Sequence, residues 1–563
     1  MVTLNVGHRE RQTMKHLTID KALRGLVATG VAVLAGLMLL KMASSLDWRM
    51  EHDTPLLHYA AFLMDVQDAV PYRDIFETSM PGTFAFHYAV VKLFGYGDFA
   101  FHCVDICLLC VLFAATYLFM ARFGRLVAFV STITFGLVYL GCGQSMTLQR
   151  DYIGVIPVAF SLLCVPRRQS TSVGLWRFGT AGLLFGLSVL VKPHLAVALP
   201  IVLGSLFVLR QHPRKPILDL VLCTVCCGTG LVAPLAIAMV WLAANAAFTP
   251  FTEMLFHYIP LHSAMTGWHE NISGLHRVGY LIENTVMLGG YGVLFVGALF
   301  GAYIVAERND IQKPVAMSFL CVLLCALSYA VYPTLAGKFW GYHYMPFAYF
   351  CAISTGFCFF SWNSKSSPRG LFRFRGVLPI MAFFAAVTIQ LNLPRYVLSL
   401  KWDLSSGVEV HAPKGGRVDE IATWLKARLR QDDTVQPLDW TGGALHAMLL
   451  SEARLATTFM YDYHFYHHVS RPLIQELRRS FIRQLQTSRP RFVIEVETNK
   501  PWVSGLDSNR SFPELKDLLN RHYVVAFRGN GYLIHERKTV EESSSAQQAP
   551  RHVPSKAAAD GGL

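Results

Sequence analysis

The stretch LRGLVATGVAVLAGLMLLKMASSLDWRMEHD, residues 23–53, indicates the class of fold to which the chain belongs. Its first part, residues 23–43, is almost entirely apolar, and about 20 such residues let a helix cross a lipid bilayer. No small-residue cleavage site follows before Asp47, Trp48 and Arg49. We therefore interpret this part as a retained membrane span and not as a cleavable signal.

The composition of the whole chain agrees with a membrane protein. Of its 563 residues, 53% are hydrophobic and only 15% are charged, against roughly 25% charged in an ordinary soluble domain. That balance excludes a disordered, collagen-like or coiled-coil protein. Ten further apolar runs follow the first, so about eleven transmembrane helices are predicted. They lie near 23–43, 100–120, 126–144, 152–166, 175–192, 194–209, 217–246, 280–305, 314–335, 344–362 and 376–394.

The charges between the spans predict how the chain is oriented. With the N-terminus in the cytoplasm, the inner segments carry 19 Lys and Arg and the outer segments only 8. Cytoplasmic loops of membrane proteins show this excess of positive charge. The net charge of +13 is thus a topology signal, and a nucleic-acid partner is excluded. We expect a multi-pass protein of the cytoplasmic (inner) membrane whose C-terminal region lies outside the cytoplasm.

The chain is predicted to divide into three regions. Residues 1–394 form the transmembrane domain, with a long first outer loop at 44–98 that carries helices near 55–64 and 82–94 at the membrane interface. Residues 395–540 form a small extracytoplasmic α/β domain, because the strands TVQPLDW and RFVIEVE alternate with amphipathic helices before a hairpin. The small, polar residues 541–563 are typical of a disordered tail.

Ionisable residues from separate segments are predicted to meet at the outer face. Asp53 begins the first outer loop, Asp151 opens the fourth span, Lys192 interrupts an apolar run, and Lys338 and His343 precede the tenth span. A charged side chain within an apolar span is costly to bury, so we treat each of these residues as a candidate for a functional role. Acids beside cations suit a site that activates a hydroxyl and holds a phosphate. Taken singly, each also fits a structural role, such as a snorkelling lysine.

Two histidine-rich stretches belong to the same outer side. The first is FHYIPLHSAMTGWHENISGLH at 256–276, and the second is MYDYHFYHH at 460–468. The first could form part of the entrance through which an acceptor reaches the site, and the second could bind sugar or metal. Neither has the spacing of a tight metal motif, so an ordinary exposed loop stays open for both.

In order, these features resemble the GT-C superfamily of polytopic glycosyltransferases. Within it, the chain is most similar to the group of protein O-mannosyltransferases and lipid A aminoarabinose transferases (glycosyltransferase family 39-like). Such enzymes move a sugar, with inversion, from a polyprenyl-phosphate carrier to an acceptor at the outer membrane face. The resemblance spans about residues 20–360. It rests on Asp53, His58-Tyr59-Ala60, Pro71-Tyr72-Arg73-Asp74, Pro81-Gly82, Asp151, Lys192-Pro193 and Gly337-Lys338 with Tyr344-Met345-Pro346.

The resemblance implies roles for the residues of the outer face. Asp53 would be the general base, and Asp151 a second acid that helps to order the site. The donor phosphate would be bound by Lys192 and Lys338, with Arg73 and His343 as further candidates. Candidates for acceptor or loop contacts are Glu51, Tyr59, Tyr72, Asp74 and Glu77. No cofactor is certain, and a divalent metal is left open. The implied partners are a polyprenyl-phosphate sugar donor, a lipid, glycan or protein acceptor, and membrane lipids.

The sequence also departs from this group. Ser79-Met80 stands where aminoarabinose transferases have a Glu-Lys pair, and Thr54 follows Asp53 where mannosyltransferases have Glu. The sugar, the acceptor and any metal therefore stay open. The alternative is a transporter or a flippase for lipid-linked sugars, but that class predicts internal repeats, and the sequence shows no symmetry between its halves. A transferase using a diphosphate carrier would favour an arginine-rich site.

Overall fold

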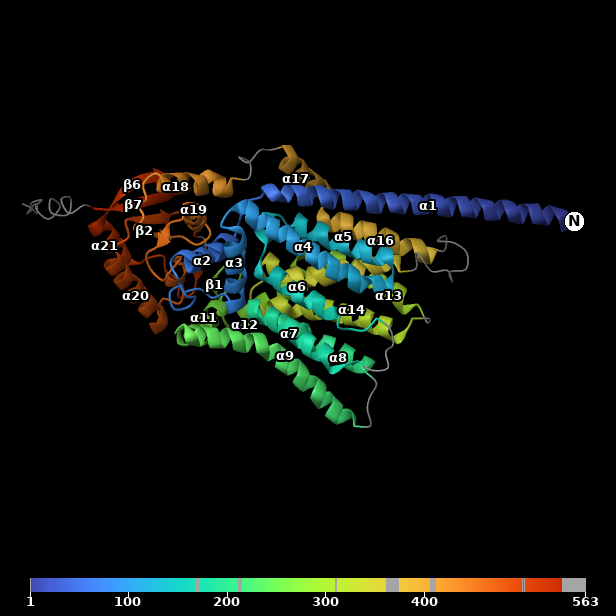
Figure 1. The fold of residues 1–563 in the computed structure, drawn as a ribbon. Coiled ribbons are helices and arrows are strands. Elements are labelled where there is room, and N and C mark those ends of the chain that lie inside the picture. Colours follow the sequence, from blue (N-terminus) through green and yellow to red (C-terminus); the bar gives the residue numbers. More distant parts are fainter. Residues whose placement is uncertain are drawn as a thin grey trace, which may run out of the picture.

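A computed structural model describes residues 2–167, 173–210, 215–308, 311–360, 374–405, 412–498, 500 and 502–538. The chain forms a long helical bundle with an α/β domain stacked on one end of it (Figure 1). This confirms the predicted fold class, a polytopic helical protein with a small C-terminal α/β domain. The predicted tail at 541–563 lies outside the described residues.

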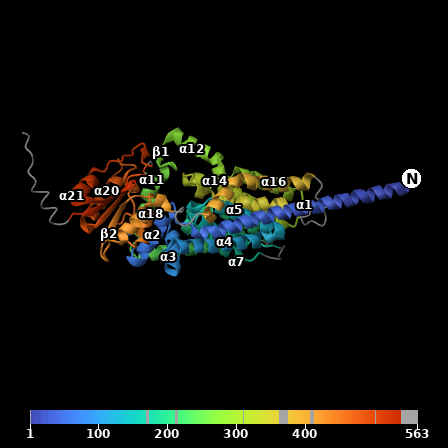
Figure 2. The ribbon, with the colours of Figure 1, turned by 90° about the horizontal axis from the view of Figure 1, so that it is seen from above.

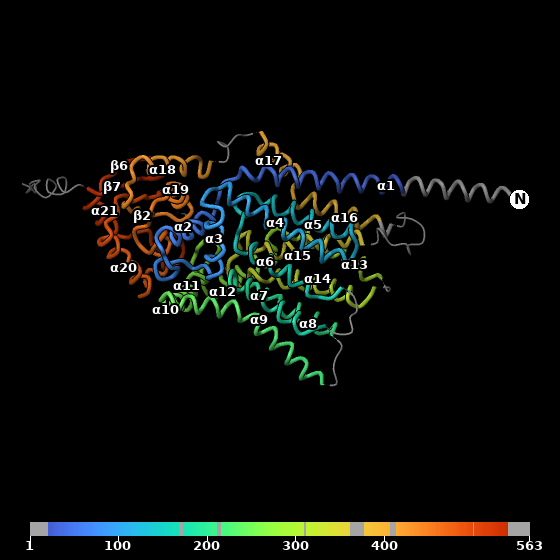
Figure 3. Tube along the Cα trace, viewed as in Figure 1, coloured from blue at the N-terminus to red at the C-terminus, as the bar shows by residue number. Residues whose placement is uncertain are grey.

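The bundle surrounds a buried central helix. That helix, α15 (Met345–Thr355), is buried along its whole length and packs against α5, α13 and α14. The helix α1 runs along one side of the bundle, and α9 diverges from the opposite side (Figures 1 and 3). The other helices of the bundle are α1 (Val2–Ser44), α4 (Asp98–Met120), α5 (Arg125–Gly141), α6 (Arg150–Leu162), α7 (Leu175–Val191), α8 (Leu199–Leu209), α9 (Pro216–Ala244), α12 (Gly274–Val286), α13 (Gly292–Ala306), α14 (Lys313–Ala336), α16 (Phe374–Leu391) and α17 (Leu393–Ser405).

Each of the eleven predicted spans contains a helix, but not all of these helices are long. By length and composition, four helical stretches in the described chain could cross a membrane, namely Lys21–Asp47, Asp98–Phe123, Pro216–Ala244 and Lys313–Ala336. Two bent pairs, α12–α13 and α16–α17, raise the number to six at most. The number of crossings stays a prediction.

The predicted span at 280–305 is not one straight helix. This stretch consists of α12 and α13, which meet at 69°. The chain between them makes a tight 3-10 turn at Leu288–Gly290, where Gly289 has φ 60°. Glycine adopts this left-handed conformation at little cost, so the paired glycines end one helix and start the next.

Close packing of α7 against α9 fixes the end of α7 beside the outer face. A Cβ atom on Gly182 of α7 would lie 2.0 Å from the carbonyl oxygen of Cys227 on α9. Small residues let membrane helices approach this closely and gain dispersion contacts. The helix ends at Val191, and the backbone of the next residue, Lys192, is extended (φ −151°, ψ 106°).

Short helices of the outer loops lie between the bundle and the α/β domain (Figure 2). In the first loop these are α2 (Thr54–Val66) and α3 (Pro81–Phe94), which confirm the helices predicted there. The loop after α9 forms α10 (Phe248–Glu253), a π-helical turn (Met254–Tyr258) and α11 (Ile259–Ala264). That α2 and α3 lie at the membrane interface stays a prediction.

The α/β domain is built on a five-stranded sheet of order β3-β2-β4-β7-β6, in which β2 runs parallel to β3 and β4 and the hairpin β6–β7 adds antiparallel strands. The predicted strands, helices and hairpin are all present. The sequence did not predict β3 and α19. The elements are α18 (Arg417–Lys426), β2 (Thr434–Leu438), α19 (Ala444–Leu450), β3 (Arg454–Leu455), α20 (Pro472–Ser488), β4 (Phe492–Val496), α21 (Pro513–His522), β6 (Tyr523–Gly529) and β7 (Tyr532–Arg537).

Polar contacts attach this domain to the outer loops. Asp98, at the start of α4, accepts a hydrogen bond from the Met50 backbone N–H (2.8 Å) and one from Arg49 Nε, and it lies 3.2 Å from His446 Nε2. Arg49 also reaches Asp419 of α18 at 3.0 Å. A second link is the parallel pairing of β1 (Glu270–Asn271) with β5 (Ser504–Gly505).

We expect Asp98→Ala to loosen the α/β domain from the bundle. The change removes the contact with His446 of α19 and leaves the Met50 N–H without its acceptor, while Arg49 keeps only Asp419. This loss costs about 2–3 kcal/mol. Thermal unfolding followed by tryptophan fluorescence should show a lower midpoint than in the wild type. Asp517→Ala is the control, because Asp517 is exposed and meets Arg521 at 3.9 Å, and such surface pairs contribute about 0–1 kcal/mol. Equal midpoints for the two variants would contradict this role of Asp98.

Candidate functional site

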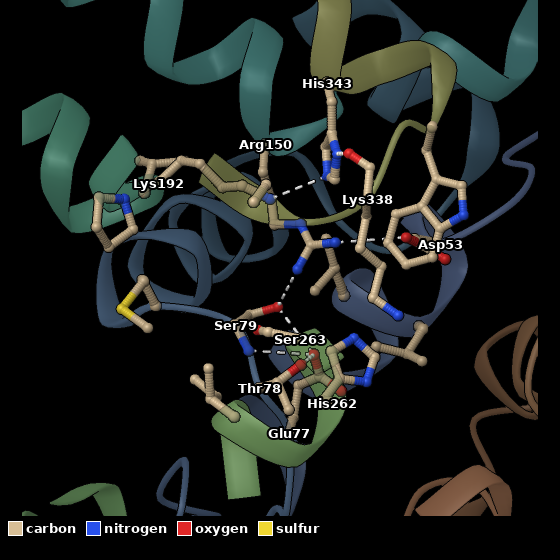
Figure 4. Close-up of a pocket in the computed structure, with 18 of the residues that line it drawn as sticks. Asp53, Glu77, Thr78, Ser79, Arg150, Lys192, His262, Ser263, Lys338 and His343 are labelled. Atoms are coloured by element: carbon tan, nitrogen blue, oxygen red, sulfur yellow. Dashed lines mark hydrogen bonds and ion pairs between the residues drawn. The ribbon is translucent and has the colours of Figure 1, made fainter. Parts of the chain in front are cut away.

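A cavity of about 350 Å³ lies where the bundle, the outer loops and the α/β domain meet. Its polar wall carries charged side chains of both signs that point inward (Figure 4). The polar and aromatic residues that line it are Asp53, Glu77, Thr78 and Ser79 of the first loop, Arg150 of α6, Lys192 and His194 after α7, His262 and Ser263 of α11, Lys338, Trp340 and His343 between α14 and α15, and Trp440, Tyr461, Tyr463 and His464 of the α/β domain.

Asp53 immediately precedes α2 and is only 6% exposed. Its Oδ2 lies 3.4 Å from Arg150 Nη2 and accepts a hydrogen bond from the Tyr342 hydroxyl (3.3 Å), while Oδ1 lies 3.1 Å from His52 Nδ1. Burial alone would raise the pKa of this carboxyl. The charges of His52 and Arg150 and the Tyr342 hydroxyl outweigh burial, so the pKa lies below its ordinary value. The site therefore holds an ionised carboxylate that can accept a proton.

Arg150 is the cation that joins the two sides of the cavity, and sequence reasoning missed it. It is the first residue of α6, and its Nη1 donates to Ser79 Oγ at 3.1 Å while Nη2 faces Asp53. In the described part of the chain, its buried Nε has no hydrogen-bond partner. The available signal was its position next to Asp151 at the start of a span. A buried guanidinium with a spare donor suits an anionic group of a ligand.

Asp151 lies behind the cavity wall and supports it. It is fully buried and accepts a hydrogen bond from the Tyr332 hydroxyl, and its Oδ2 is 3.9 Å from Lys192 Nζ. Lys192 Nζ also lies 3.3 Å from His343 Nε2. The structure thus brings together three of the residues predicted from separate segments. Asp151 holds the lysine that lines the cavity and does not line it itself.

Lys338 enters the cavity from the loop after α14. Its ammonium donates to the Thr266 carbonyl (3.2 Å) and lies over the Trp340 ring. Burial, together with a smaller contribution from the charge of Arg277, lowers the pKa of Lys338 to about 7. The backbone carbonyl of the same residue lies 2.7 Å from His343 Nδ1, which connects the two cationic segments.

Glu77 connects the first loop to the α/β domain at the floor of the cavity. Its Oε1 accepts hydrogen bonds from Ser79 Oγ (2.9 Å) and Ser79 N (3.2 Å), and its Oε2 accepts one from the Tyr461 hydroxyl. Burial raises the pKa of Glu77 although these donors and Arg150 act in the opposite direction. Two acids of one cavity therefore differ, because Asp53 is held ionised and Glu77 is made a weaker acid.

Besides Asp151, five other predicted residues lie outside the cavity. Tyr59 donates to the Ala453 carbonyl at 2.8 Å, and Tyr72 donates to the Ser79 carbonyl at 2.6 Å. Arg73 pairs with Asp74 at 2.7 Å and also donates to the Asn245 carbonyl. Glu51 faces Lys414 of the α/β domain at 3.8 Å. The structure gives these side chains contacts within the protein and does not bring them to the cavity.

The two histidine-rich stretches meet above the cavity. His262 and His464 line it together with Tyr463, and the Tyr463 hydroxyl contacts His269 Nδ1 at 2.9 Å. Burial lowers the pKa of His464 to about 3, so this ring is neutral. Within the described residues, no three His, Cys, Asp or Glu side chains are grouped as a metal ion requires. The stretches are thus packed parts of the site, and a metal requirement stays open.

No protein-family model and no curated protein sequence matches the chain. Solved structures do match its fold. ArnT from Cupriavidus metallidurans, solved bound to undecaprenyl phosphate, is 12% identical, with 90% of this chain and 98% of that chain covered and a TM-score of 0.54. The oligosaccharyltransferase of Archaeoglobus fulgidus, tethered with an acceptor peptide, is 11% identical, with 92% and 74% covered and a TM-score of 0.45. The likeness to ArnT confirms a GT-C-like fold of multi-pass membrane proteins.

Proposed function

We propose that the chain is an inverting glycosyltransferase that takes a sugar from a polyprenyl-phosphate carrier. The observation that carries this proposal is one cavity in which an ionised carboxylate, Asp53, faces three cations, Arg150, Lys192 and Lys338. Transfer of a glycosyl group from a phosphate to a hydroxyl needs both parts. A base must accept the proton of the hydroxyl, and cations must stabilise the charge that grows on the departing phosphate.

In this reaction the acceptor lies next to Asp53, and the phosphate of the carrier lies next to the cations. The acceptor hydroxyl loses its proton to Asp53 as its oxygen attacks the anomeric carbon from the face opposite the carrier. The bond between that carbon and the phosphate oxygen breaks, and its electron pair stays on the phosphate. Lys192 and Arg150 stabilise this charge, and Asp151 and His343 hold Lys192 in place. Attack from the opposite face inverts the anomeric centre.

The fold supports the choice of carrier. The solved ArnT with which this chain shares its fold is bound to undecaprenyl phosphate, and a polyprenyl phosphate presents the anion that three buried cations require. We propose the cytoplasmic membrane as the location, with the N-terminus in the cytoplasm and the α/β domain outside, as the distribution of Lys and Arg indicates. The acceptor is a lipid, glycan or protein reached from that outer side. The sequence symmetry expected of a transporter is absent.

The experiment compares cells that lack the protein, cells that express the wild type, and cells that express Asp53→Asn. Mass spectrometry of their lipids, glycans and glycoproteins should show a sugar on one acceptor in the wild type alone. Purified protein in nanodiscs should then transfer that sugar from its polyprenyl-phosphate donor. Restoration of the modification by Asp53→Asn would reject Asp53 as the base. Substrate uptake into vesicles that survives this substitution would favour the transporter.

We expect binding of undecaprenyl phosphate to weaken as the pH rises through the pKa of Lys338. The pKa of Lys338 is about 7, so the cationic form that attracts phosphate predominates below this pH and is lost above it. Loss of one charge-assisted hydrogen bond would weaken binding by about tenfold. The dissociation constant measured between about pH 6 and pH 9 should show this change, and Lys338→Met should remove it. The same pH dependence in both proteins would mean that another group titrates.

A further inference from the structure

His52 lines a second, smaller opening that lies next to the cavity. Its Nδ1 lies 3.1 Å from Asp53 Oδ1, and its side chain is 40% exposed although Asp53 is buried. The backbone of His52 has φ 60°, a conformation that residues other than Gly adopt infrequently. This turn lets two successive side chains face each other. One oxygen of Asp53 is thereby left for His52, while the other is bound by Arg150 and Tyr342.

The second opening is a crevice between the first outer loop and the α/β domain. It has a volume of about 20 Å³ and is lined by His52, Glu51 and Leu56 on one side and by Lys414 and Trp440 on the other. That volume suffices for one water molecule. Leu56 and Trp440 also line the large cavity, so the two openings share a wall. Glu51 and Lys414, which are partly exposed and lie 3.8 Å apart, form its polar side.

We propose that His52 is the outlet for the proton that Asp53 removes from the acceptor, and that the crevice conducts this proton to solvent. This inference rests on the proposed function. The acceptor proton passes to Asp53 as the glycosyl bond forms. His52 acts from its neutral form, in which the proton is on Nε2. It takes the Asp53 proton on Nδ1 and becomes cationic, and the cation then gives its Nε2 proton to water in the crevice. The carboxylate is restored without sending a proton back through the substrate cavity, and proton exchange with the crevice water returns the ring to its Nε2–H form.

The charges around the pair agree with this role. The carboxylate of Asp53 raises the pKa of His52 against burial, and Lys414 lowers it. Once protonated on both nitrogens, the ring in turn holds the pKa of Asp53 down, which favours passage of the proton from Asp53 to His52. The groups that face the pair from all sides are Glu51 of the same loop, Arg150 of α6, Tyr342 before α15, Lys414 of the α/β domain and, at longer range, Lys192, Glu77 and His269.

The first test measures transfer by His52→Asn across a range of pH. Asn accepts the left-handed backbone but carries no proton to exchange. We expect kcat to fall by on the order of 10²-fold, with the donor KM unchanged. Without the cationic ring the pKa of Asp53 rises, so the acid limb of the profile should move to higher pH. Added imidazole should restore part of kcat in His52→Gly, which keeps the backbone conformation and leaves room for the ring. His522→Gln, an exposed histidine of α21, is the control.

An unchanged kcat and profile in His52→Asn would overturn the proposal. So would a loss that imidazole does not relieve and that leaves the acid limb in place, since that pattern indicates a structural contact. A second test needs no turnover and therefore does not depend on the proposed function. Histidine-selective NMR of the protein in nanodiscs should show the His52 titration, identified by its absence in His52→Asn, move to lower pH in Asp53→Asn. A titration that does not move would show that the two groups are uncoupled.

Discussion

Asp53→Asn should lower kcat for sugar transfer by about 10²–10⁴-fold, the usual contribution of a positioned general base. The amide keeps the size of the side chain and can still accept a hydrogen bond from Tyr342, but it cannot take a proton from the acceptor hydroxyl. In the proposed mechanism the donor phosphate is bound by Lys192 and Lys338, which line the cavity from other segments. The dissociation constant for undecaprenyl phosphate should therefore stay within about threefold of the wild type. The change in binding free energy is then well under the ~1.4 kcal/mol that corresponds to a tenfold effect.

Asp65→Asn is the matched control for this substitution. Asp65 belongs to the same loop and pairs with Lys92, but it does not line the cavity. Its replacement should leave kcat unchanged. The measurement is initial-rate transfer by protein of equal thermal stability. A parallel loss in both variants would assign the effect to the fold of the loop and not to a base at Asp53.

Much of the fold follows from local patterns in the sequence. Apolar runs locate the helices of the bundle because a helix in lipid must present apolar side chains and satisfy its own backbone. Alternation of apolar residues and the Asn530-Gly531 turn locate the strands β4, β6 and β7. The break at Gly289 could not be read in this way, because the apolar character continues through it and only the left-handed backbone ends the helix.

The site could be predicted only in part, for the same reason. Asp53, Lys192 and Lys338 stand out because each charge interrupts apolar surroundings. Arg150 does not stand out, since its importance comes from contacts with Ser79 and Asp53, which lie 71 and 97 residues away in the chain. The aromatic side chains that the α/β domain contributes to the cavity, such as Tyr461, could not be predicted either. Nothing in the sequence near Tyr461 shows that Glu77 is its partner.

The α/β domain is thus a structural part of the site. Tyr461 binds Glu77, and Tyr59 binds the Ala453 carbonyl, so the first loop is held between the bundle and the domain. A phosphate in a cavity that is partly enclosed in this way is less solvated, which strengthens its attraction to the cations. The domain therefore affects the chemistry even though the charged residues themselves come from the bundle and its loops.

Arg150→Met should lower kcat by about 10²–10³-fold, comparable with the loss of one preorganised donor at a developing charge. The guanidinium acts on both reactants. It lowers the pKa of Asp53 through Nη2, and its unpartnered Nε is available to the donor phosphate. We therefore also expect binding of undecaprenyl phosphate to weaken by about tenfold, in contrast to Asp53→Asn. Arg125→Met, which removes an exposed arginine at the start of α5, is the control for the loss of one positive charge.

The double variant Asp53→Asn with Arg150→Met separates the two actions of the arginine. If Arg150 acts on kcat partly through Asp53, the combined loss in kcat is smaller than the product of the single losses, as in other groups of residues that act as a unit. The loss in phosphate binding should instead be the same in the Asp53→Asn background as in the wild type, because that contact does not pass through the carboxylate. Full additivity in kcat would show that Arg150 serves the phosphate alone. Unchanged phosphate binding in Arg150→Met would show that it serves only to position and ionise Asp53.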